Sequence, residues 1–166
     1  MTEDAIAHFR LLARYNARAN ARLYDVCAAM PAEEIARPRG AFFGSILGTL
    51  NHILVGDRIW MARFAGRTVP STGLDAILHD TLPALREARE AEDARIVAFV
   101  DALGPADLAG AIVYGDNAGN RREDPRDLLL LHVFNHQTHH RGQVHDLMSR
   151  AGVAPPSLDM HRVMRP

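Results

Sequence analysis

Helical periodicity is the feature that most limits what this chain can fold into. Four long stretches place apolar residues three or four positions apart, and no stretch alternates convincingly enough to predict a sheet. The predicted helices cover residues 3–29, 45–64, 81–103 and 125–150. At 166 residues and 48% hydrophobic composition the chain can bury a sizeable core. The sequence therefore predicts an all-α fold, a four-helix bundle forming a single domain over residues 1–166.

Local signals mark several helix ends. Ser45 is the expected N-cap of the second helix and Asp124 that of the fourth, and the third is expected to start with Thr81 before Pro83, a first-turn proline. Gly66 and Gly152 follow the second and fourth helices, where glycine commonly ends a helix.

The connections between the helices are uneven. Residues 31–44 and 104–124 are long links for a compact domain, and long links permit crossover connections within a bundle. Inside the second link, the segment AIVYGDNAGNRRE is expected to form a small hairpin around its Asn-Ala-Gly-Asn turn. A single turn or short helix is expected at 74–79, and the proline-interrupted tail should pack as irregular chain.

Composition argues against several functional classes. The net charge of −1 supplies no general attraction for nucleic acid, and no apolar run approaches the length of a membrane span. Cys27 is the only cysteine, so no internal disulfide can form. The N-terminal segment lacks the basic-then-apolar layout of a secretory signal, so a reducing cytoplasmic location is expected.

A row of arginines on the first helix offers a rival reading. Arg10, Arg14, Arg18 and Arg22 are spaced four apart and could in principle contact phosphates. The row drifts by about 120° over its length, however, and no aromatic residues are interleaved with it. Ion pairs to the acidic third helix, or a solvated face, explain it more simply.

Histidine is concentrated in the last helix, where residues 128–148 hold five of the nine histidines. His136 and His140 lie one turn apart, so both rings can reach a single ion. Leu129 and Val144 share their broad face, which places the pair on the core side of the helix. A buried imidazole needs a partner, and either a metal ion or buried polar neighbours could supply it.

His52 on the second helix is the best candidate for a third ligand. Gly44, Gly48 and Gly56 stand eight before, four before and four after it, and Trp60 follows eight residues on. Glycines cost about 1 kcal/mol each inside a helix relative to alanine, so their presence calls for compensation. They indicate either close helix packing or a pocket above a metal.

Three segments together resemble a known family. NHILVGDRIW, HVFNHQTHHRGQV and AGVAPPSLD are similar to segments of the DinB/YfiT-like superfamily of metalloenzymes, and the resemblance covers almost the whole chain. It implies a four-helix bundle, commonly a homodimer, with a divalent metal held by three histidines. Carried over by position, the ligands are His52, His136 and His140, with no departure from the family pattern.

The resemblance also implies a chemistry. Three neutral ligands leave an open position on the ion, which is the pattern of catalytic sites. Zinc or nickel is the first expectation, with iron, manganese or copper as alternatives. Family members suggest a thiol transferase or isomerase that activates a low-molecular-weight thiol and acts on a small-molecule substrate. A metal-dependent hydrolase, or a non-catalytic metal or small-ligand carrier in a stress response, remains open.

The residues around the triad receive weaker assignments. His132, His139 and Trp60 are expected to line the pocket or to support the ligands from behind. No general base is assigned, because Asp57 lies off the ligand face and is better explained by a salt bridge. The remaining expectations are a substrate or dimer contact for Arg141 and Gln143, solvation for His145 and a core position for Cys27.

Overall fold

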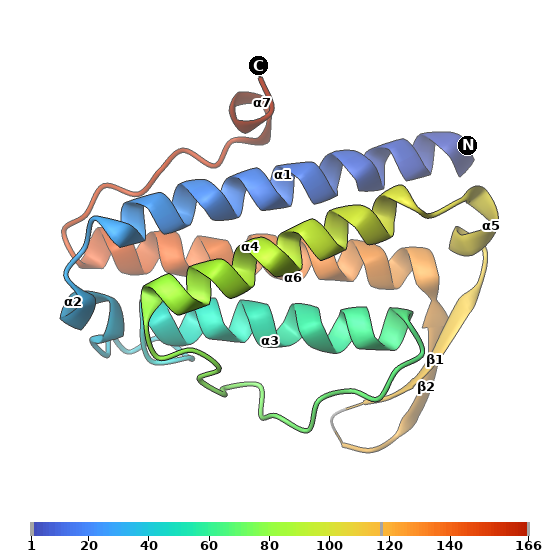
Figure 1. Cartoon of the computed structure of the whole chain (residues 1–166), viewed down its shortest axis with the longest axis horizontal. Helices are drawn as coiled ribbons and strands as arrows, with labels where there is room; N and C mark the ends of the chain where they lie inside the picture. The colour runs from blue at the N-terminus through green and yellow to red at the C-terminus, as the bar shows by residue number, and fades with distance from the viewer. Residues whose placement is uncertain (1, 117, 166) are drawn as a thin grey trace.

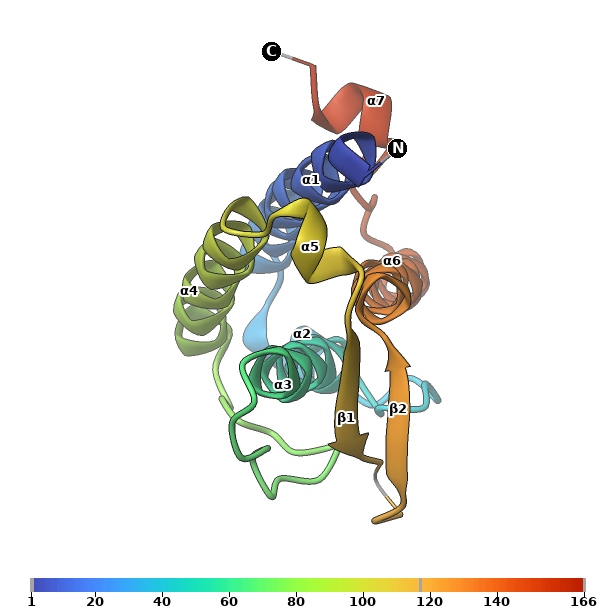
Figure 2. The same ribbon diagram turned by 90° about the vertical axis from the view of Figure 1, so that its right-hand side faces the viewer.

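The computed structural model describes residues 2–116 and 118–165. Four long helices lie side by side and confirm the predicted four-helix bundle (Figures 1 and 2). Helices α3 and α6 are adjacent and run in opposite directions (Figure 1). The long helices are α1 (Thr2–Ala28), α3 (Ile46–Phe64), α4 (Leu82–Asp101) and α6 (Arg126–Arg150).

Three short helices were not predicted: α2 (Ala32–Ala36) and α5 (Pro105–Leu108) in the connections, and α7 (Met160–Val163) in the C-terminal tail. Residues 74–79 form only a turn, in which the Ala76 amide donates to the Gly73 carbonyl. No helix in the described part of the chain is long and apolar enough to cross a membrane.

The expected hairpin is present as β1 (Ala111–Gly115) and β2 (Arg121–Pro125). The strands pair antiparallel, with Gly115 opposite Arg121. At the turn the Asp116 carboxylate accepts hydrogen bonds from the backbone amides of Ala118 and Asn120. The first residue of the expected Asn-Ala-Gly-Asn turn, at position 117, lies outside the described residues. The hairpin stands at the end of the bundle where α3 ends and α6 begins (Figure 2).

The helix caps were predicted with mixed success. Ser45 caps α3 by accepting from the Gly48 amide at 3.0 Å. Thr81 is at the N-cap position of α4, but its side chain makes no capping hydrogen bond. The prediction for Asp124 was wrong, because α6 begins one residue later, after Pro125. Asp124 belongs to β2, where its carboxylate accepts from the Tyr114 hydroxyl at 2.9 Å.

The core of the bundle has two large apolar parts, besides a small cluster between α1 and α7. Both draw residues from all four long helices: Phe9, Met61, Ile96 and Phe134 in the first, and Leu23, Leu50, Leu85 and Val144 in the second. Along every long helix, buried polar residues separate the two parts. We call this set the polar layer; it consists of Asn16, Asn20, Asp57, Arg89, Asp93, Gln137 and Arg141.

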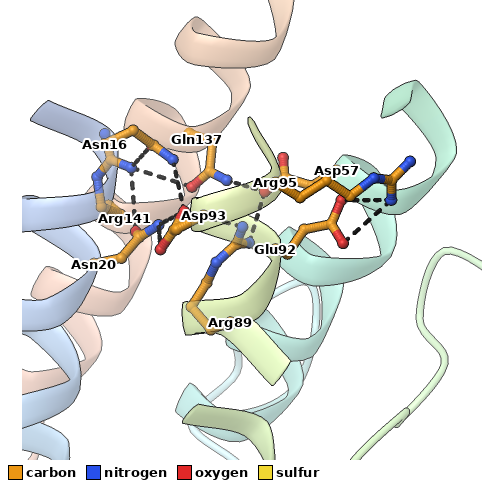
Figure 3. Close-up of polar contacts among 9 residues, drawn as sticks. All are labelled: Asn16, Asn20, Asp57, Arg89, Glu92, Asp93, Arg95, Gln137 and Arg141. Carbon is orange, nitrogen blue, oxygen red and sulfur yellow. Dashed lines mark hydrogen bonds and ion pairs between the residues drawn. The ribbon is translucent and has the colours of Figure 1, made fainter. Parts of the chain in front are cut away.

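The polar layer is a connected network across the bundle (Figure 3). Arg89 pairs with Asp57 at 2.6 Å and with Asp93 at 3.0 Å, so one guanidinium joins two carboxylates. Asp93 also accepts from Asn20 of α1 at 3.1 Å. On α6, Gln137 donates to Asp57, and Arg141 donates to Gln137 at 3.1 Å and Asn20 at 3.2 Å. Each of the four long helices is thereby joined to the others.

The arginine row on α1 pairs partly as expected. Arg14 forms an ion pair with Asp101 at the end of α4, at 3.0 Å, and Arg10 lies 3.8 Å from the same carboxylate. Arg22 instead donates to the Ser157 carbonyl in the C-terminal tail at 3.3 Å. The row therefore holds α1 against α4 and the tail.

Candidate metal centre

Three ring nitrogens from two helices meet at one point. His52 is on α3, and His136 and His140 are on α6. The Nε2 atom of His52 lies 3.1 Å from the Nε2 of His136 and 3.1 Å from that of His140. The potential ligand atoms of the three residues all fall within 4.8 Å of one another. The structure thus brings together the three residues that the sequence pointed to as ligands.

Hydrogen bonds on the opposite ring nitrogens determine which atoms carry protons. His52 Nδ1 donates to the Leu74 carbonyl at 2.7 Å, and His140 Nδ1 donates to Gln143 Oε1 at 2.8 Å. With the proton on Nδ1, a neutral ring has a lone pair on Nε2. Two lone pairs therefore point toward each other, an arrangement that a shared cation stabilises.

The surroundings keep the imidazoles neutral. Burial, and then the neighbouring histidines His140 and His52, lower the pKa of His136 to about 3. Burial likewise lowers the pKa of His140 to about 4, even though its bond to Gln143 opposes the change. Burial also lowers the pKa of His52, against the opposing effect of the Leu74 carbonyl. All three rings are neutral at pH 7, which is the form that binds a metal.

The donor set fits a divalent transition metal. Two nitrogens each 2.0–2.1 Å from one tetrahedral ion are about 3.3 Å apart, close to the separations of 3.1 Å found here. Three imidazole donors suit zinc, nickel, copper or iron, whereas magnesium and calcium prefer oxygen ligands.

The three glycines near His52 in the sequence have different structural roles. A Cβ atom at Gly56 would lie 2.8 Å from Cε1 of His136, so a glycine here lets that ring approach α3. A Cβ at Gly48 would lie 2.1 Å from the Phe43 carbonyl oxygen. Gly44 precedes the helix and adopts a left-handed φ of 76°, which favours glycine.

The loop before α3 contributes a ring that the sequence did not indicate. Phe43 stacks on His52 with a centroid separation of 3.7 Å and an interplanar angle of 15°. It also meets the edge of His140 at 5.6 Å. Nothing in the local sequence marks Phe43, because the loop reaches the histidines only through tertiary folding. Phe43 covers one side of the candidate site.

A pocket opens on another side of the site. Its volume is about 180 Å³, and it lies between α3 and α6. Trp60 and His132 lie together on its wall, with their rings in edge-to-face contact at a centroid separation of 5.1 Å, and the His132 ring is 5.9 Å from that of His136. The pocket is lined by His52, Gly56, Ile59, Trp60, Arg63, Leu74, His132 and His136.

Comparisons with known proteins agree with this architecture. The model of the DinB family matches residues 1–166. The chain belongs to the DinB family. Protein DinB of Bacillus subtilis (strain 168) is 27% identical over 158 residues, covering 89% of this chain and 88% of the relative.

Solved structures show the same fold as this DinB-family chain. A DinB-like protein from Bacillus cereus ATCC 10987 has a TM-score of 0.66 at 22% identity, covering 87% of this chain and 91% of its own. A DinB family member from Shewanella denitrificans has a TM-score of 0.63 at 14% identity, covering 96% and 94% of the two chains.

The DinB-like string on α6 also contains residues that lie behind the site. Gln143 bonds His140 through its oxygen and His139 through its nitrogen, at 2.8 and 3.2 Å. His139 itself is exposed; its ring contacts the edge of the His140 ring at a centroid separation of 4.8 Å, in addition to the link through Gln143. The sequence left Gln143 as a substrate or dimer contact; its spacing of three from His140 was the available signal for this role.

Several other residues take positions that differ from expectation. Arg141 is 2% exposed and belongs to the polar layer, so it cannot reach a substrate or a second subunit as suggested. His145 is half-buried rather than solvated, with Nε2 3.2 Å from the Pro156 carbonyl oxygen of the returning tail. Asp57 makes its salt bridge, to Arg89. Cys27 lies in the core, and burial raises the pKa of its thiol to about 12.

Proposed function

We propose that this DinB-family chain is a metal-dependent enzyme whose His52, His136 and His140 hold one divalent ion, with zinc or nickel as the expected metals. The observation that carries the proposal is the convergence of three neutral imidazoles beside an open pocket. A purely structural zinc site usually has four protein ligands, whereas three ligands and an open side are typical of catalysis.

The bound ion would lower the pKa of a thiol or water at its open position. The chain's own residues prepare that position. Leu74 and Gln143 hold His52 and His140 in one orientation, and Phe43 closes the side away from the pocket. A substrate can therefore approach along the side where the pocket lined by Trp60 and His132 opens.

The pocket favours transfer or isomerisation with a low-molecular-weight thiol over hydrolysis. In metal-dependent proteases a carboxylate takes the proton of the attacking water. No carboxylate lines the described pocket wall. A thiol bound as thiolate needs no such base, because the ion itself favours the deprotonated form. An open pocket also argues against a sealed carrier.

The test begins with metal analysis of the purified protein, followed by a screen of thiols paired with electrophiles on metal-replete protein. We expect about one ion per chain and thiol consumption that requires the metal. Ester and amide hydrolysis without thiol consumption would favour the hydrolase. Tight metal binding with neither activity would favour the carrier.

A further inference from the structure

The pocket has a cationic end opposite the three histidines. We propose that Arg63 forms an anion-binding subsite, so that the pocket takes an elongated small organic molecule bearing a carboxylate. This inference rests on the proposed function in one respect, since the reacting end of that molecule is assigned to the metal. It names a substrate class through the chain's own residues.

Arg63 lies on the same face of α3 as His52. The two are eleven residues apart, which is three turns and roughly 16 Å along the helix axis. Gly56 and Trp60 occupy the intervening turns of this face, and all four residues line the same pocket. A ligand that touches both ends must therefore be long and narrow, and its body would pass the Trp60 ring.

The Arg63 guanidinium is held in one place. Its Cζ atom lies 4.5 Å from the ring centroids of both Trp60 and Tyr114. Its Nη2 donates to the Gly115 carbonyl of the hairpin at 2.8 Å. A cation that is already oriented loses little conformational entropy when it binds a ligand.

Arg63 nevertheless lacks a carboxylate partner among the described residues. Its Nε–H is buried and has no acceptor there, and no described Asp or Glu oxygen lies within the 4.0 Å of an ion pair. Asp116, the acid whose charge acts on Arg63, is itself bound to Arg122 at 2.9 Å and to Asn120 at 3.1 Å. A partly buried cation without a counter-charge among the described residues favours an anion from outside the chain.

The experiment uses the only tryptophan of the chain, Trp60, as a reporter. Zinc-loaded and metal-free protein are titrated with 8-mercaptooctanoate and with 8-mercaptooctanamide, and Trp60 fluorescence gives the dissociation constants. The two probes share their thiol, so the metal contribution cancels in the ratio. We expect the carboxylate to bind roughly 10-fold more tightly than the amide, as for a charge-assisted hydrogen bond.

Variants assign the preference to Arg63. In Arg63→Met the ratio should fall to about one with the amide affinity unchanged, and in Arg63→Lys part of it should remain. Arg58→Met removes a positive charge from the same helix outside this pocket, and it should keep the 10-fold ratio. Thermal melting of each variant shows whether the substitution has only removed the contact with the hairpin or has destabilised the whole fold.

Two outcomes would overturn the subsite: a ratio near one in the wild-type protein, or a full ratio retained in Arg63→Met. Metal analysis of the same samples separates this inference from the proposed function. If no zinc binds, the proposed metal enzyme fails, and the ratio measured on the metal-free protein still decides whether Arg63 binds the carboxylate.

Discussion

At the scale of single residues, the three imidazoles converge because a neighbouring group fixes the position of each ring. His52 is held by the Leu74 carbonyl and His140 by Gln143, while His136 lies against α3 at Gly56. These contacts set the rotation of two rings and the approach of the third. Preorganisation of this kind raises metal affinity, since the ligands need not be ordered upon binding.

Replacing His136 by alanine should abolish stoichiometric metal binding and any turnover together, because two histidines hold an ion weakly. His139→Ala should keep the stoichiometry, with affinity falling about 10- to 100-fold if the link through Gln143 supports His140. Metal analysis of both metal-loaded variants measures the stoichiometry, and thermal melting of their metal-free forms should show that the fold survives each change. Metal retained by the His136 variant and lost by the His139 variant would reverse the ligand assignment.

Gly56→Ala should reduce metal affinity by at least 10-fold without unfolding the protein. The new methyl group would lie 2.8 Å from His136 Cε1 and push that ring away from the other two. Gly142→Ala is the matched control, since nothing lies within 4 Å of its Cβ position on α6. The control should keep its metal and gain about 0.5–1 kcal/mol of stability from helix propensity. Equal metal affinities in the two variants would contradict this role for Gly56.

The stability of the metal-free protein should fall as the pH drops below 6.5. The pKa of His136 is about 3 in the folded chain against 6.5 for the ordinary group, so between these values the unfolded chain binds a proton that the folded chain does not. Above pH 6.5 this group does not lower the free energy of unfolding. Between pH 6.5 and pH 3 the free energy of unfolding falls progressively, and at pH 5 the loss is at most about 2 kcal/mol. Urea unfolding with a chelator at pH 7 and pH 5 measures the loss, and His136→Ala should show a correspondingly smaller one. Equal losses of stability between pH 7 and pH 5 in the wild-type protein and in His136→Ala would contradict this role for His136.

At the scale of secondary-structure elements, the polar layer determines how the helices align (Figure 3). It connects Asp57 of α3, Arg89 and Asp93 of α4, and Arg141 of α6 with the asparagines of α1. Asp57 follows Gly56 directly, and Gln137 follows His136. A slip of α6 along α3 would therefore break the polar layer and separate the histidines at the same time.

Removing one partner of the buried pair should be costly. Arg89→Met leaves the Asp57 and Asp93 carboxylates buried without their cation, and we expect a loss of about 3–5 kcal/mol in the free energy of unfolding. Arg86→Met is the control on the same helix, where exposed ion pairs to Asp25 and Glu90 should be worth less than about 1 kcal/mol. Urea unfolding compares the two variants. Similar losses in the free energy of unfolding would show that the polar layer contributes no more to stability than the exposed ion pairs do.

At the scale of the whole molecule, apolar surface remains uncovered on α6 and the hairpin. Leu128 and Leu131 are three residues apart on α6 and are 53% and 50% exposed, and Val113 of β1 is 51% exposed. Side chains of this kind are commonly covered by a second copy of the chain in symmetric dimers.

We expect light scattering to report a homodimer at micromolar concentration. The double variant Leu128→Glu/Leu131→Glu should shift the protein toward monomer, because like charges would face each other across a two-fold axis. Ile77→Glu, at an exposed site in the link before α4, should leave the dimer intact. A wild-type protein that is monomeric throughout the micromolar range would contradict the prediction.

The sequence by itself determined the long helices, the hairpin and the candidate ligand set. Helical periodicity is a local property, and the spacing of His136 and His140 places both on one face whatever the rest of the chain does. The short helices α2, α5 and α7 were missed, because elements of four or five residues carry too little periodicity. Asp124 was misassigned for a related reason: pairing of β2 with β1 overrode a local capping signal.

Tertiary structure alone decided what surrounds the histidines. Phe43 and Leu74 reach His52 from loops on either side of α3, and Tyr114 reaches Arg63 from the hairpin. Arg141 was read as a surface residue, yet it is buried because Asn16 and Asn20 of α1 supply acceptors more than 120 positions away. A charged side chain is buried only where partners compensate its lost hydration. That compensation depends on which helices become neighbours, and no local pattern in the sequence encodes it.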